Sequence, residues 1–180
     1  MINNSNPKHP ILNIKSYSSI PIIELSEVKN FLKVEFEEDD NLIKNLINTA
    51  IFQCEKIINK SLLEKTYIYS IYTYQKKIIL PYPTIKIINK IEIITKNNSS
   101  LLDTNEYFID NVSNSIIFKN NIQSVYRIDI EYTTNSNLIE NDLKQALLMH
   151  IAQLYENRNG NFTMPNNVLN IYYQHKNIKI

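Results

Sequence analysis

The chain has 180 residues, with 19 basic and 18 acidic side chains and a formal net charge of +1. This length accommodates one ordinary domain, or a small domain with a sizeable insertion. The balanced charge argues against a dedicated binder of the nucleic-acid backbone, because such proteins carry a basic surplus. The single cysteine, Cys54, excludes an internal disulfide. The single glycine, Gly160, excludes a P-loop, a dinucleotide-binding fingerprint and a nucleophile elbow, because each needs several glycines.

Residues 1–20 are polar, and we expect them to form a mobile N-terminal extension that lacks the apolar core of a signal peptide. No apolar run in the chain approaches the roughly 20 residues that a membrane-spanning helix needs. We therefore expect a protein that is made in the cytoplasm and has no membrane partner.

Two helices are predicted at the start of the folded region. Residues 26–33 carry apolar side chains at helical spacing, with Ser26 as the expected N-cap. Residues 40–59 have a broader apolar stripe, and the acidic run 37–40 is expected to offset the positive end of their helix. A divalent-cation site is the other interpretation of this run, although the spaced oxygen ligands of a calcium loop are missing. Phe52 points away from the stripe, either as a lone exposed side chain or as a subunit contact.

From residue 66 to residue 132 the apolar pattern has a period of two, which predicts an inserted, mainly antiparallel β block. The cleanest alternation runs from Val125 to Tyr132. Residues 85–95 also alternate, with apolar odd-numbered positions and exceptions at 88 and 89. Pro81-Tyr82-Pro83 predicts a break between strands. The other strand candidates are residues 67–74, 77–80, 107–110 and 115–118, with a hairpin turn at 111–114.

The tyrosines of the first predicted strand leave a second function open. Aromatic side chains on a sheet can stack the bases of single-stranded nucleic acid, so a sheet-based single-stranded nucleic-acid-binding module is the alternative. Without a basic groove, strand formation or assembly explains these residues better. They are Tyr67, Tyr69, Tyr72 and Tyr74.

A last helix is predicted over residues 141–158, with Asn141 or Asp142 as its N-cap. Leu148 and Ala152 widen its apolar arc past half of the circumference, which is typical of a helix covered on two sides. The second cover is either the β block or a neighbouring subunit. If it is a subunit, changing Leu148 to Asp weakens assembly and preserves the fold.

These elements predict an α+β fold. The N-terminal helix pair and the C-terminal helix form a small helical bundle, and the β block is inserted between them. We expect the folded domain to span residues 21–162 and a C-terminal tail to span residues 163–180.

No residues in the sequence form a recognisable catalytic or metal site. His9, His150 and His175 have no partner at metal-ligand spacing. His150 and Cys54 lie on apolar helix faces, which predicts a satisfied core or interface histidine and a buried structural thiol. No local arrangement of Ser, His and Asp forms a nucleophile. We therefore expect no enzymatic activity, no cofactor and no metal, and an unrecognised enzyme is the least favoured alternative.

Several ordered motifs carry a resemblance to a known family. Leu25-x-x-Val28-Lys29-x-x-Leu32 precedes the acidic run and the long helix. Ile79-Leu80-Pro81-Tyr82-Pro83 precedes an isoleucine-rich strand, and Ile130-Glu131-Tyr132 precedes the last helix. That helix holds Leu143-Lys144-Gln145-Ala146 and Leu154-Tyr155-Glu156-Asn157-Arg158, and Met164-Pro165-Asn166-Asn167-Val168-Leu169 follows it. Together these motifs resemble the head–tail connector, or adaptor, proteins of tailed phages, prophages and gene-transfer-agent-like particles.

The resemblance covers residues 20–173 and has two departures. The family often has proline where this chain has Glu140, and it commonly has glycine in the loop that here spans residues 133–137. The resemblance implies a structural subunit that forms a homo-oligomeric ring of about twelve copies below the portal protein. The ring would bind the next connector or tail-completion protein, and DNA would only pass through its channel. Such a subunit is assembled in the bacterial cytoplasm and resides in the virion or phage-like particle.

The resemblance also implies that the segment from Pro165 to Tyr173 grips the portal. The alternative is that this segment packs on its own domain. The candidate residues for the portal or subunit interface are Phe52, Leu148, Ala152, Pro165, Val168, Leu169, Ile171, Tyr172 and Tyr173.

Overall fold

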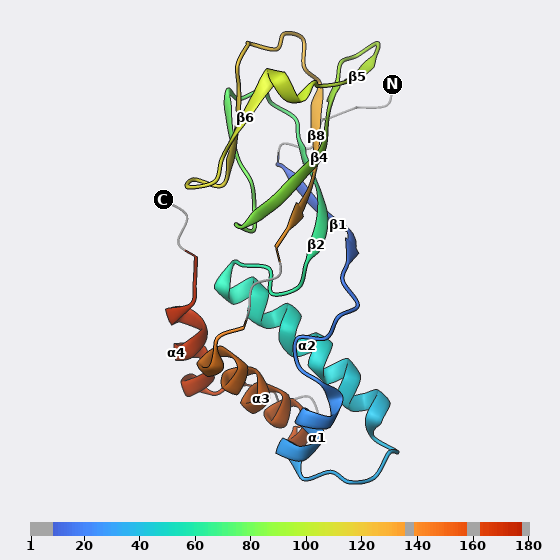
Figure 1. The fold of residues 1–180 in the computed structure, drawn as a ribbon, viewed down its shortest axis with the longest axis vertical. Helices are drawn as coiled ribbons and strands as arrows, with labels where there is room; N and C mark the ends of the chain where they lie inside the picture. Colours follow the sequence, from blue (N-terminus) through green and yellow to red (C-terminus); the bar gives the residue numbers. More distant parts are fainter. Residues whose placement is uncertain (1–8, 136–138, 158–162, 178–180) are drawn as a thin grey trace, which may run out of the picture. The chain divides into compact units, whose positions relative to one another are not determined.

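The computed structural model describes residues 9–135, 139–157 and 163–177 (Figure 1). The chain divides into two compact units. A β unit comprises Met1–Ser18 and Leu63–Ser136, and a helical unit comprises Ser19–Leu62 and Asn137–Ile180. The predicted α+β class is confirmed, because the described residues form helices and antiparallel sheets in separate stretches of the chain.

The β unit contains two antiparallel sheets with the strand orders β1-β2-β8-β4-β5 and β3-β7-β6. Side chains from both sheets form one buried cluster, which includes Tyr67, Ile116 and Ile130. The two sheets therefore share a core. The elements are β1 (Ile11–Tyr17), β2 (Lys65–Ile71), β3 (Lys77–Ile79), β4 (Ile85–Ile94), β5 (Ser99–Leu101), the short 3-10 helix η1 (Thr104–Glu106), β6 (Tyr107–Asp110), β7 (Ser115–Phe118) and β8 (Arg127–Thr134).

The alternating pattern predicted the inward faces of β8 and of most of β4. In β8, Ile128, Ile130 and Tyr132 are fully buried. In β4 the register shifts twice, between Ile85 and Ile87 and between Ile88 and Lys90. Each shift moves the following residues to the opposite face. Ile88 is therefore buried, and the expectation that Ile87 faces the core is wrong because this side chain is exposed.

The prediction of a mobile extension is wrong for residues 11–17, which form strand β1. This strand pairs antiparallel with β2, from Ile11 opposite Ser70 to Tyr17 opposite Lys65. Pairing satisfies one edge of β2, and Leu12 packs against the core of the β unit. Asparagine, serine and lysine residues in the segment conceal its strand pattern in the sequence. Residues 1–8 lie outside the described part of the chain.

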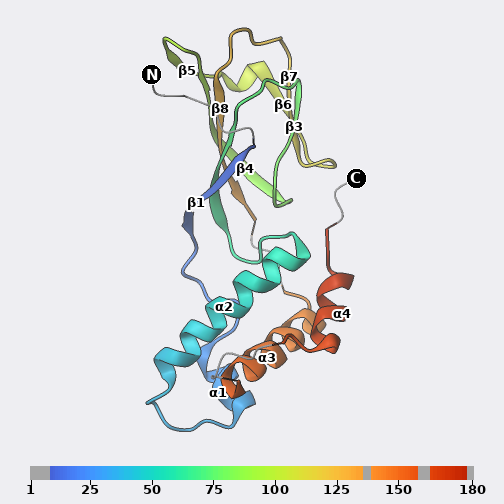
Figure 2. The ribbon, with the colours of Figure 1, turned by 180° about the vertical axis from the view of Figure 1, so that it is seen from behind.

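The helical unit contains α1 (Leu25–Leu32), α2 (Asp40–Ile58), α3 (Asn141–Glu156) and α4 (Asn166–Gln174). Helix α3 contacts each of the other three, as the view in Figure 2 also shows for α2 and α4. The predicted three-helix bundle therefore contains a fourth helix, α4, in the segment expected to be a tail. The core of the helical unit includes Ile43, Ala50, Cys54, Ile58, Ala146, Leu147 and Ile151.

The structure corrects two predicted helix starts. Helix α1 has Glu24 as its N-cap, so Ser26 lies inside the helix. Helix α3 has Glu140 as its N-cap, so Asn141 and Asp142 are its first helical residues. None of these caps makes a side-chain hydrogen bond to the helix end. The helix starts are therefore set by tertiary packing more than by local capping.

Candidate functional site

Helix α4 packs antiparallel along the first half of α3. Its inward residues Val168 and Tyr172 are fully buried, and Leu148 on α3 is 6% exposed. These three side chains lie in the core of the subunit, and their part in a portal or subunit interface stays a prediction. The positions of Val168 and Tyr172 agree with the alternative that the segment packs on its own domain.

The outward residues of α4 remain accessible. Tyr173 is 56% exposed, and Pro165 and Leu169 are half-buried. Because residues four apart share a helix face, Pro165, Leu169 and Tyr173 form one stripe, called here the outer stripe of α4. The ammonium of Lys176 lies 5.7 Å from the centre of the Tyr173 ring. The remaining candidates are Ile171 and Ala152, which are half-buried, and Phe52, which is 37% exposed.

A buried polar contact joins three helices behind this stripe. The Tyr172 hydroxyl lies 3.1 Å from Nδ1 of His150 on α3 and also hydrogen-bonds the Cys54 thiol on α2. Burial lowers the pKa of His150 to about 4 and raises the pKa of Cys54 to about 12. At neutral pH the imidazole is therefore uncharged and the thiol keeps its proton. The predictions of a core histidine and a buried structural thiol are confirmed.

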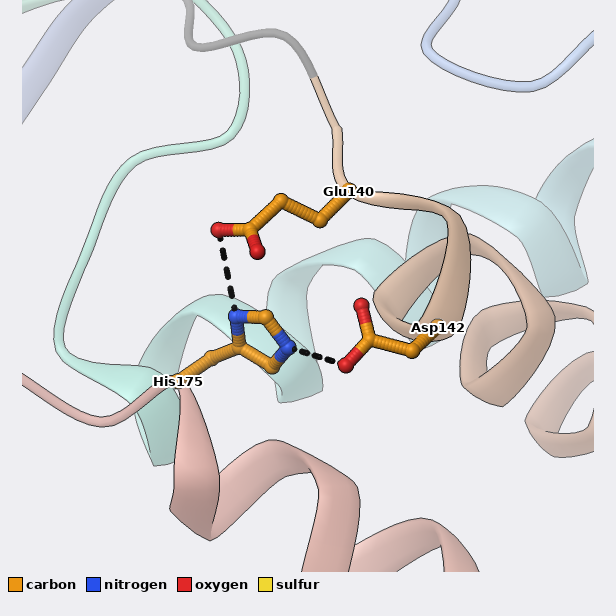
Figure 3. A group of neighbouring side chains, drawn as sticks. All are labelled: Glu140, Asp142 and His175. Carbon is orange, nitrogen blue, oxygen red and sulfur yellow. Dashed lines mark hydrogen bonds and ion pairs between the residues drawn. The ribbon is translucent and has the colours of Figure 1, made fainter.

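A second polar contact joins the end of α4 to the start of α3 (Figure 3). Nε2 of His175 lies 2.8 Å from Oδ2 of Asp142, and Nδ1 lies 3.5 Å from Oε1 of Glu140. The His175 side chain is 10% exposed, whereas the two carboxylates reach into solvent. The hydrogen bond with His175 is the largest of the interactions that lower the pKa of Asp142. Sequence spacing did not predict this group, because His175 lies 33 residues beyond Asp142.

Within the described residues this group alone brings three acidic or histidine side chains together, with one ligand atom from each within 4.8 Å of the others. An imidazole offers a metal ion one nitrogen at a time. Each carboxylate here lies against a different ring nitrogen, as Figure 3 shows. In this arrangement Asp142 and Glu140 therefore each contact their own ring nitrogen and do not share one.

The acidic run before α2 connects helices. Asp40 lies in the first turn of α2, and its Oδ1 is 2.5 Å from Nζ of Lys29 on α1. Asp39 is the N-cap of α2 and accepts a hydrogen bond of 2.5 Å from the Tyr155 hydroxyl on α3. The two aspartates therefore tie the start of α2 to both neighbouring helices. Their position at the start of α2 agrees with the prediction that acidic side chains there offset the positive end of the helix dipole.

The tyrosines of the predicted strand 67–74 do not present an open stacking surface, and the strand itself ends at Ile71. Tyr67 is 1% exposed and stacks with Tyr82 and Tyr132, at ring-centre distances of 5.2 Å and 5.4 Å. Tyr69 and Tyr74 are half-buried, and the Tyr74 hydroxyl donates to the carbonyl of Asn120. These rings therefore belong to the core of the β unit and its margin.

A cavity of about 640 Å³ lies between the end of β4 and the start of β8. Its lining offers one charged group, Lys96, and no pair of acid and base groups for catalysis. The lining residues are Thr95, Lys96, Asn97, Ser124, Val125 and Tyr126. None of the helices in residues 9–135, 139–157 and 163–177 combines the length and the apolar character that a membrane span requires.

Comparison with known protein families shows the family to which the chain belongs. The model of the head completion protein family matches residues 21–178, which include helices α1 to α4 and all strands after β1. This chain belongs to the head completion protein family. The predicted resemblance to head–tail connectors is thereby confirmed.

Solved structures similar to this chain come from gene transfer agent (GTA) particles. A chain from the neck of an empty GTA particle, computed with C6 symmetry, has a TM-score of 0.74 and 15% identity. A chain from the virion of a native GTA particle has a TM-score of 0.75 and 15% identity. A chain from the neck of a native particle, computed with C12 symmetry, has a TM-score of 0.71 and 16% identity. Each match covers 94% of this chain and 97% of the other, so the whole fold is shared. No curated protein sequence matches this chain.

Proposed function

We propose that this protein is a structural subunit of the head–tail junction of a phage-like particle. It forms a ring below the portal protein and joins the DNA-filled head to the tail. The family match over residues 21–178 carries this proposal. The similarity to neck chains from particles computed with C6 and C12 symmetry supports a ring of about twelve copies. The partners are further copies of the chain, the portal protein and the next connector or tail-completion protein, while DNA passes through the channel.

The chemistry of the helical unit supports a structural role. Two of its groups that can act as a base or a nucleophile, His150 and Cys54, are kept uncharged at neutral pH by burial. Both are covered by α4, and the Tyr172 hydroxyl of that helix makes a hydrogen bond with each of them. The role of His150 and Cys54 is therefore to stabilise the packing of the helices.

The outer stripe of α4 is the proposed contact with the portal. Val168 and Tyr172 attach the helix to its own subunit, which leaves Leu169 and Tyr173 to face a partner. Apolar and aromatic side chains of this kind supply most of the binding energy in interfaces. Phe52, Ala152 and Ile171 are further candidates for the portal or subunit interface.

The test is to mix the purified chain with the portal protein encoded by the same phage-like element. Mass photometry and negative-stain images are expected to show a complex with a ring of this subunit below the portal. Leu169→Asp should weaken that complex while preserving the helical circular dichroism signal, and His9→Gln should change neither. Absence of any portal complex, together with tight and salt-sensitive binding of single-stranded oligonucleotides, would refute the proposal in favour of a nucleic-acid-binding module.

A further inference from the structure

Three side chains that can ligate a metal ion meet where the end of α4 reaches the start of α3 (Figure 3). His175 is the C-cap of α4, Glu140 is the N-cap of α3, and Asp142 lies in the first turn of α3. One ligand atom of each residue lies within 4.8 Å of the other two. Ligand atoms around a zinc ion are roughly 3 to 4 Å apart, because each lies about 2 Å from the metal. Small side-chain rotations therefore bring the three groups onto one ion.

Two of the three groups are already held in place. Oδ1 of Asp142 accepts a hydrogen bond of 2.8 Å from the backbone N–H of Leu143, and Oδ2 lies 2.8 Å from Nε2 of His175. The His175 side chain is 10% exposed, and the backbone beyond it is fixed because the N–H of Asn177 donates to the carbonyl of Ile58 on α2. Hydrogen bonds behind the ligands orient them in this way in metal sites.

Glu140 is the third ligand and the one that has to turn. Its Oε1 lies 3.5 Å from Nδ1 of His175, whereas Asp142 contacts Nε2. A metal ion takes one ring nitrogen, so an ion at Nε2 requires the Glu140 carboxylate to rotate towards that edge of the ring. The Glu140 side chain is 71% exposed and makes no capping hydrogen bond to α3, so the rotation breaks no contact with the helix end.

The charge and the chemistry of the donors favour a divalent transition metal. The two carboxylates supply negative charge that a divalent cation balances, and the C-terminus of α4 also favours a cation. Lys176 follows His175 in the chain, but its ammonium lies over the Tyr173 ring. An imidazole nitrogen with two carboxylate oxygens suits zinc, whereas magnesium and calcium prefer shells made of oxygen alone.

We propose that Glu140, Asp142 and His175 form a binding site for a divalent transition-metal ion, with zinc as the best match, and that the ion fastens the end of α4 to the start of α3. Both carboxylates reach solvent, so water completes the coordination shell. In the metal-free chain α4 is held by the packing of Val168 and Tyr172, and the bound ion adds to this attachment. The inference does not depend on the proposed function.

Zinc binding to the full-length chain tests the site. The protein is stripped with EDTA, dialysed and titrated with zinc chloride by isothermal titration calorimetry. We expect a single zinc ion per chain, with no comparable binding of magnesium or calcium. Changing a group behind a ligand typically weakens metal binding about 10- to 100-fold, so loss of a ligand in His175→Gln or Asp142→Asn should weaken it at least about a hundredfold. Glu140→Gln should weaken binding less, by about tenfold, because this ligand is not held in place.

Hydrogen exchange shows whether the ion fastens α4. At a free zinc concentration about ten times the Kd, opening that releases the metal should be suppressed about tenfold, so amide protection in residues 166–174 should rise by this factor. Peptides from β8 should exchange alike with and without zinc. His9→Gln, which changes an exposed histidine outside the helical unit, should bind zinc as the wild type does.

The proposal is overturned if the wild type binds no zinc at millimolar concentration, or if His175→Gln and Asp142→Asn bind it as tightly as the wild type. Stronger binding of magnesium or calcium at the same residues would overturn the assignment to a transition metal. Zinc that binds without raising protection in residues 166–174 would overturn the fastening of α4. Asp142→Asn and Glu140→Gln change exposed side chains and should keep the fold, which circular dichroism of the metal-free variants checks.

Discussion

Protonation of His150 gives the sharpest test of how the helical unit is held together. Its imidazole is fully buried, and its Nδ1 contacts the Tyr172 hydroxyl. Burial lowers its pKa from 6.5 to about 4. Between these pH values the unfolded chain binds a proton that the folded chain excludes. The free energy of unfolding therefore falls as the pH drops from about 6.5 towards 4.

The size of this effect follows from the shift. A pKa difference of 2.5 units, which is 6.5 minus 4, corresponds to about 3 kcal/mol at 1.36 kcal/mol per unit. We expect the wild type to lose about this much stability between pH 7 and pH 4 through His150 alone. His150→Gln has a side chain that can hydrogen-bond and does not titrate, so its stability should change much less over the same interval.

Urea unfolding followed by circular dichroism at 222 nm measures the difference, because this signal reports mainly on the helices. Asp142, whose pKa is lowered in the folded chain, is present in both chains, so the stability that it loses as the pH approaches 4 cancels in the comparison. Parallel stability curves for wild type and His150→Gln would refute the reasoning, because they would mean that the buried imidazole does not resist protonation.

Three further predictions concern packing. Val168→Asp should destabilise the helical unit by about 3 kcal/mol or more, because it buries an unpaired charge, whereas Leu169→Asp should change the thermal midpoint little. Leu148→Asp should likewise melt the helical unit, and a normal melting curve for it would favour the interface prediction for that residue. Tyr155→Phe removes the hydrogen bond to Asp39 and should cost about 1 kcal/mol in urea unfolding, with no effect expected if that bond is absent in solution.

Helical spacing and alternation predicted the elements whose patterns are continuous. The apolar positions of α2 and α3 and the alternation in β8 were recognised because each is repeated over several turns or residues. Helix α4 was missed because it is short, follows a proline and begins with two asparagines. The signal that could have found it is its paired spacing, in which Val168 and Tyr172 share one face and Leu169 and Tyr173 share the other.

The sequence by itself determined the fold class, the inserted β block, the lack of glycine-dependent motifs and the resemblance to connectors. These depend on composition, short-range periodicity and ordered motifs, which are local properties of the chain. Only the tertiary structure decided that residues 11–17 pair as a strand, that Ile88 faces inward after a shift in register, and that His175 meets Asp142. Each of these depends on residues distant in sequence, and pairing or burial between such residues is set by the whole fold.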